Sequence, residues 1–242
     1  MERTVTEAIK YRRSIRIYMD DAPLDDEKVR QCLVNSTLAP TSSNMQLWEF
    51  YHITDKGKLK ALAKACLDQP AAKTAQQLVV VVTRKDLWRK RSKANLGFLR
   101  NGLGDKPMEE YSTRDKFALK YYSQLIPMVY MDFLGVLGAL KYLFFQVLGL
   151  FKPTYRQVRN SDMRVVAHKS AALAAENFMV SMAAIGYDTC PMEGNDTLRV
   201  KKILNLPWGA EINMVIGCGI RDEEGVYGPR FRVPFDEVYH KI

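Results

Sequence analysis

The chain has 242 residues, of which 47% are hydrophobic and 26% are charged, and its formal net charge is +9. This composition excludes a disordered protein and predicts one globular domain, residues 1–242, with a substantial core. The positive charge calls for an anionic partner. Since no zinc-finger, RNA-recognition or helix-turn-helix motif accompanies it, we expect a small phosphorylated molecule and no nucleic acid.

Four cysteines and three histidines are widely separated in the sequence. They show neither CxxC spacing nor the spacing of metal ligands, so we expect free cysteines and no metal site. The first residues are not followed by an apolar run. We therefore expect no signal peptide and a cytoplasmic protein.

Hydrophobic periodicity predicts the elements of the first third of the chain. A short helix should end at the basic run 12–16, and a second helix should span 24–38. A strand is predicted over Trp48–Ile53 and a helix over 56–66. The continuous apolar run at 78–82, a leucine followed by four β-branched valines, indicates a strand that is buried on both faces.

The last third of the chain contributes a long helix and another strand. Residues 165–185 form a helical stretch that is apolar nearly all round, which suits the middle of a core or a subunit contact. Residues 212–218 predict a further central strand. Together these elements predict an α+β fold in which helices flank a central sheet.

The middle third, residues 85–164, contains an unusually apolar stretch at 125–151, whose only charged residues are Asp132 and Lys141. This length would span a bilayer as a helix, but the two charges oppose insertion. A proline and three glycines within it indicate two shorter elements. We expect a lid that covers the active site and extends a dimer contact; a shallow membrane contact is the alternative.

Three basic side chains lie within five residues in Arg12-Arg13-Ser14-Ile15-Arg16, and forked guanidinium donors suit phosphate oxygens. A second basic pair lies near the other terminus in the stretch 229–234. The stretches 40–48 and 191–194 lie between these two. In this order and spacing, the four stretches resemble the nitroreductase family of FMN-dependent oxidoreductases.

The resemblance implies a nitroreductase-like fold with a central, mostly antiparallel sheet flanked by helices. Residues 85–164 would be the long helical insertion that varies within the family. It also implies FMN as cofactor, NADH or NADPH as reductant, and a homodimer with the flavin site at the subunit interface.

In the family, basic residues from both termini hold the FMN phosphate. Arg12 and Ser14 match the N-terminal positions, and Arg13 lies between them. Arg230 and Arg232 match the paired C-terminal positions. The resemblance therefore implies that the two ends of the chain converge on one dianion.

Two further stretches match positions that face the flavin ring. Arg16 matches a basic residue near the pyrimidine side of the ring, and Pro191, Met192, Glu193 and Gly194 match the stretch along one ring face. There the family uses the backbone N–H at the Glu–Gly step to hydrogen-bond flavin N5, and glycine lets the backbone come close.

The remaining matched positions are polar. Thr41, Ser42 and Asn44 match a loop that the partner subunit contributes in the family, and Gln46 is a further candidate amide contact. Alternatively, these residues form only a turn that ends the preceding helix, since their types are common in turns. Gln69 matches one member of an amide pair that reaches the ring.

The implied activity passes hydride from NAD(P)H to an electron-poor small molecule, a nitroaromatic or a quinone, in two half-reactions. No obligatory catalytic side chain is implied. The alternatives are a flavin-dependent reductive dehalogenase, a metabolite-specific dehydrogenase, and a membrane-associated flavin-binding protein.

Overall fold

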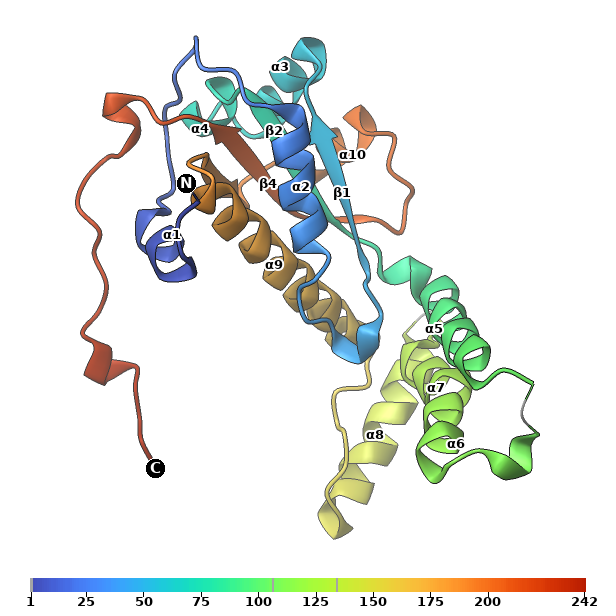
Figure 1. The fold of residues 1–242 in the computed structure, drawn as a ribbon. Coiled ribbons are helices and arrows are strands. Elements are labelled where there is room, and N and C mark those ends of the chain that lie inside the picture. The colour runs from blue at the N-terminus through green and yellow to red at the C-terminus, as the bar shows by residue number, and fades with distance from the viewer. Residues whose placement is uncertain (1, 106, 134) are drawn as a thin grey trace.

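A four-stranded antiparallel sheet in the order β1-β2-β4-β3 forms the centre of the computed structural model, which describes residues 2–105, 107–133 and 135–242 (Figure 1). The strands are β1 (Trp48–Ile53), β2 (Gln77–Thr83), β3 (Asp188–Met192) and β4 (Glu211–Gly219). The sheet and its helices confirm the predicted α+β class.

Helices lie on both faces of this sheet and in a projection beyond one end of it (Figure 1). They are α1 (Val5–Tyr11), α2 (Asp26–Ser36), α3 (Lys56–Ala65), α4 (Pro70–Lys73), α5 (Trp88–Leu103), α6 (Thr113–Lys120), α7 (Ile126–Tyr130), α8 (Val136–Phe151), α9 (Asn160–Ala184) and α10 (Thr197–Ile203).

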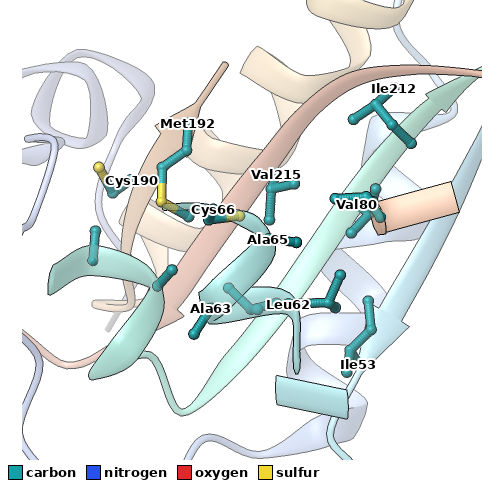
Figure 2. Packing of buried hydrophobic residues seen from close by; sticks show 14 of the residues in the cluster. Ile53, Leu62, Ala63, Ala65, Cys66, Val80, Cys190, Met192, Ile212 and Val215 are labelled. Atoms are coloured by element: carbon teal, nitrogen blue, oxygen red, sulfur yellow. The ribbon is translucent and has the colours of Figure 1, made fainter. Parts of the chain in front are cut away.

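Strand β2 is buried along its whole length, as its β-branched run predicts. Alternate side chains of a strand point to opposite faces, so β2 contributes to two separate cores. Val80 packs with α3, α4 and α10 in the cluster shown in Figure 2. Val81 packs on the opposite face with α2 and α9.

Helix α9 begins at Asn160, five residues before the predicted start. Its inner side is buried in the core and includes Phe178 and Met182. Its outer side carries Val165 and Leu173, which are 47% and 49% exposed in the single chain. The helix therefore lies in the core on one side and leaves apolar side chains uncovered on the other.

The helical segment 85–164 projects from the end of the sheet (Figure 1). A third apolar cluster joins it to the body, with Met45 and Leu47 packing against Ile126 and Tyr130. The stretch 125–151 forms two shorter helices, α7 and α8, as predicted. Among the described residues, no helix combines the length and the apolar character needed to cross a membrane.

The chain ends in a tail, residues 227–242, that leaves the body and is exposed throughout (Figure 1). Its apolar side chains include Phe231 and Phe235, which are 78% and 68% exposed. All four cysteines are buried free thiols, as the sequence predicts.

Candidate functional site

Basic residues from both ends of the chain meet around one cavity of about 180 Å³. The cavity is lined by Arg12, Arg13, Ser14, Pro229, Arg230, Phe231 and Arg232. Arg13 Nη2 donates to the Gly228 carbonyl at 2.6 Å, and Arg230 Nη2 donates to the Lys10 carbonyl at 2.9 Å. These two bonds hold the N-terminal and C-terminal stretches together, which brings the predicted phosphate residues to one place.

The lining of the cavity holds four guanidiniums and no carboxylate, and one of the four, Arg12, pairs at 3.8 Å with Glu176, which lies outside the lining. Loss of hydration lowers the pKa of Arg230, and the positive charges of Arg13, Arg232 and Arg12 lower it further. An anion among these guanidiniums would relieve their repulsion and receive charge-assisted hydrogen bonds. The donor set suits the oxygens of a phosphate.

A cluster behind the cavity fixes the end of α1. The Tyr11 ring lies 3.7 Å from the Arg3 guanidinium and 4.1 Å from that of Arg221. Asp188, whose side chain is 2% exposed, accepts from the backbone N and the Nε of Arg221, both at 2.9 Å. Because Tyr11 directly precedes Arg12, this cluster determines where the arginine run leaves the helix.

The stretch after the arginine run lies alongside β3. Ser14 forms a parallel bridge with Thr189, and Ile15 N donates to the Thr189 carbonyl at 3.2 Å. Arg16 Nη1 lies 3.5 Å from Cys190 Sγ. Burial raises the pKa of the Cys190 thiol, while the neighbouring Arg16 charge opposes that rise. The Thr189 hydroxyl is buried with no partner among the described residues.

The chain emerges from β3 next to Gln69, at the turn between α3 and α4. Gln69 Nε2 donates to the Gly194 carbonyl at 2.7 Å. A Cβ added at Gly194 would meet only that amide nitrogen, at 3.5 Å, so the backbone is open to close approach. Met192, the last residue of β3, packs its side chain into the core (Figure 2) and is paired with Val215 of β4.

The predicted ring-contact loop lies elsewhere in the single chain. Its predicted site residues are Thr41, Ser42, Asn44 and Gln46. Ser42 N donates to Ser170 Oγ at 3.3 Å, and Asn44 Nδ2 donates to Asn95 Oδ1 at 2.8 Å. Asn44 and Gln46 have positive φ values of 49° and 48°. The loop is thus held in a specific shape against α9 and α5, away from the lining of the arginine cavity.

A second cavity, of about 340 Å³, lies between this loop and the helical segment 85–164. Its lining is mainly apolar and includes the aromatic side chains Tyr121, Tyr130, Phe145 and Tyr155. Ser43 Oγ lies 2.6 Å from the Tyr121 hydroxyl, and burial raises the pKa of Tyr130 to about 12. These residues are absent from the predicted site. The density of aromatic residues between 121 and 155 is the signal that could have indicated them.

A nitroreductase family model matches residues 9–220, and this match identifies an oxidoreductase. The chain belongs to the nitroreductase family. It is 26% identical over 218 residues to Protein DrgA of Synechocystis, covering 90% of this chain and 84% of that protein.

Two further relatives extend over nearly the whole chain. Identity to the "Putative NAD(P)H nitroreductase MhqN" of Bacillus subtilis is 22% over 232 residues, covering 96% of each chain. A solved structure from Exiguobacterium sibiricum, described as "a putative nitroreductase in complex with FMN", superposes with a TM-score of 0.67 at 22% identity and full coverage of both chains. This structural likeness supports the nitroreductase fold.

Proposed function

We propose that this protein is an FMN-dependent oxidoreductase that passes hydride from NADH or NADPH to an electron-poor aromatic acceptor, a nitro compound or a quinone. The arginine cavity carries the proposal. Its four guanidiniums, drawn from both ends of the chain, suit a terminal phosphate dianion. A similar protein of the same fold is described as a complex with FMN, and another is named for NAD(P)H.

Side chains near the cavity fit the rest of FMN as well. Arg12, Arg13 and Arg232 would hold the phosphate, while Arg230 anchors the tail through the Lys10 carbonyl. The open backbone at Gly194 suits an edge-on contact with a planar ring. Bound FMN would supply the two-electron chemistry, accepting hydride from a nicotinamide and giving it to an acceptor.

Arg16 would place a cation near the ring. Its guanidinium is held beside Cys190 at 3.5 Å, where the buried and protonated thiol presents no competing negative charge. A cation in this position stabilises negative charge that develops nearby during reduction. Its expected role is electrostatic, and it transfers no proton.

A second copy of the chain would complete the site. The ring-contact loop is held in a defined shape but lies apart from the arginine cavity, so a loop from a partner could reach the cofactor of the first chain. The uncovered Val165 and Leu173 of α9 and the exposed tail 227–242 offer apolar contact area for such a homodimer.

The 340 Å³ cavity favours a selective enzyme over one with an open site. The cavity adjoins the ring-contact loop. Its lining is mainly aliphatic and aromatic, and it includes several tyrosines. Such a lining suits a flat apolar molecule that carries a few hydrogen-bonding oxygens. Quinones and nitroaromatics have this character.

The cofactor assignment is tested by denaturing the purified, yellow protein and identifying the flavin that is released. We expect FMN. Arg232→Ala should weaken FMN binding by roughly ten- to a hundredfold, since one charge-assisted contact is lost. Arg199→Ala is the control, because that arginine pairs with Asp196 on α10. Release of FAD, or equal FMN affinity in both variants, would contradict the proposal.

A further inference from the structure

Helix α8 lies at the outer end of the helical segment 85–164 (Figure 1), and one side of it carries exposed apolar side chains. The large apolar side chains on it that are exposed are Val136, Leu137, Leu140, Leu143, Phe144, Val147, Leu150 and Phe151. Leu150 and Phe151 are 76% and 82% exposed. A contiguous apolar patch of this kind is unusual on a soluble monomer and marks an interaction surface.

The polar side chains of α8 are all engaged on its inner side. Lys141 Nζ donates to the carbonyl that follows α7 at 2.7 Å, and Arg156 Nη1 donates to Gln146 Oε1 at 2.7 Å. The Arg159 guanidinium lies 4.6 Å from the Tyr142 ring. These contacts fix the rotation of the helix about its axis, so its outward side is left without polar groups.

The same segment carries nearly all of the net charge of the protein. Residues 85–164 hold 15 lysines and arginines and 7 aspartates and glutamates, which gives +8 of the total of +9. From residue 133 to residue 161 the sequence has no acidic side chain. An apolar helix surface therefore projects from a strongly cationic part of the molecule.

We infer that α8 docks onto the surface of an anionic lipid bilayer, lying in the plane of the interface. Leu143, Phe144, Val147 and Leu150 would enter the acyl boundary, while the net positive charge of the segment 85–164 attracts it to anionic headgroups. The 16 residues of α8 extend about 24 Å, less than the roughly 30 Å hydrocarbon thickness, so the helix suits an interfacial position better than a span.

Charge and apolar surface together distinguish an anionic bilayer from the two other candidate partners, a nucleic acid and a second copy of the chain. A nucleic acid would match the positive charge but offers no apolar surface to the leucines and phenylalanines. The same segment of a second copy would bring another +8 to the contact and repel it. An anionic bilayer meets both requirements, because it offers negative charge and an apolar interior within a few ångströms of each other.

Sedimentation of the full-length, flavin-loaded protein with lipid vesicles tests the inference without measuring enzyme activity. We expect binding to phosphatidylcholine vesicles that contain phosphatidylglycerol, much weaker binding to pure phosphatidylcholine, and partial release at high salt. Leu150→Glu should weaken the partition coefficient roughly tenfold or more, since it removes a buried leucine and adds a repelled charge.

Leu198→Glu on α10 is the matched control, because Leu198 is 77% exposed, like Leu150 at 76%. It should bind vesicles as the unchanged protein does, and thermal melts check that both variants fold. Three results would overturn the inference: no binding to anionic vesicles, equal binding to neutral ones, or equal losses in both variants. Dissociation of a dimer by Leu150→Glu, without vesicle binding, would assign α8 to a subunit contact instead.

Discussion

At the scale of single residues, Asp188 is the carboxylate on which the shape of the candidate site depends. It lies at the start of β3, is 2% exposed, and receives two hydrogen bonds from Arg221 at 2.9 Å. Arg221 in turn lies over the ring of Tyr11, and Tyr11 is the residue directly before the arginine run. A buried charge of this kind is costly to leave without its partner.

Asp188→Asn should therefore lower the free energy of unfolding by about 2 kcal/mol, because the charged pair is lost while the side-chain shape is kept. The measurement is urea denaturation monitored by circular dichroism. Glu27→Gln is the control, since Glu27 forms an exposed pair with Arg30 and should change stability far less. Equal effects would mean that the Asp188 pair does not stabilise the fold.

At the scale of elements, β4 depends on two residues without side chains. A Cβ at Gly217 would lie 2.6 Å from the Ala71 carbonyl oxygen, and one at Gly219 would lie 2.5 Å from the Tyr18 ring. The absence of a side chain at these positions lets α4 and the N-terminal stretch pack directly on the sheet. Close backbone approach of this sort is a common reason for glycine within a strand.

Gly217→Ala should accordingly destabilise the protein by about 1–3 kcal/mol. The added methyl group would clash with the Ala71 backbone carbonyl, which cannot relieve the clash by changing rotamer as a side chain can. The informative comparison is Gly97→Ala in α5, where a Cβ meets nothing within 4 Å. That substitution should stabilise the protein by about 0.5–1 kcal/mol through helix propensity. Urea midpoints of the two variants should therefore move in opposite directions; a shared direction would contradict the packing argument.

Elements with a clear apolar period were predicted well from the sequence. The strand Trp48–Ile53 is as predicted, and the strand predicted at 78–82 extends by one residue at each end. β3 was missed, because Asp188 and Pro191 are poor strand formers. Its place at the edge of the sheet explains why a proline is tolerated there.

The candidate site could be predicted only in part. Local clusters of arginine indicated the residues at the two sides of the arginine cavity, because like charges close together in a sequence are easily recognised. The Asp188–Arg221 pair and the Arg16–Cys190 contact join residues far apart in the chain, and no local pattern indicates such contacts. The second cavity depends on how α7 and α8 pack, which a single sequence does not specify.

At the scale of the whole molecule, apolar surface is left uncovered at α9, at α8 and along the tail. The tail touches the N-terminal stretch through Gly228 and Arg230, and farther along it carries exposed apolar residues at intervals, among them Phe235, Val238 and Ile242. Exposed apolar groups on an extended arm suit a contact with a second copy. The tail also includes Arg232, which lines the arginine cavity, so the position of the tail affects the shape of that cavity.

Sedimentation should find a dimer at micromolar concentrations, and removal of residues 234–242 should weaken its association roughly tenfold or more. This truncation keeps Arg230 and Arg232, so FMN content after purification separates loss of the dimer from loss of the phosphate site. A control truncation of Ile242 alone should leave the association unchanged. A flavin-loaded monomer in the full chain would contradict the expectation.

The strand order has a consequence for how the protein is made. β4 is the last strand to be synthesised, yet it lies inside the sheet, between β2 and β3. A nascent chain that has not reached residue 211 therefore holds two strands with unpaired edges and cannot complete its core. The arginines at 230 and 232 emerge later still. The arginine cavity, which needs both the N-terminal and the C-terminal stretch, therefore forms only after every strand of the sheet has been synthesised.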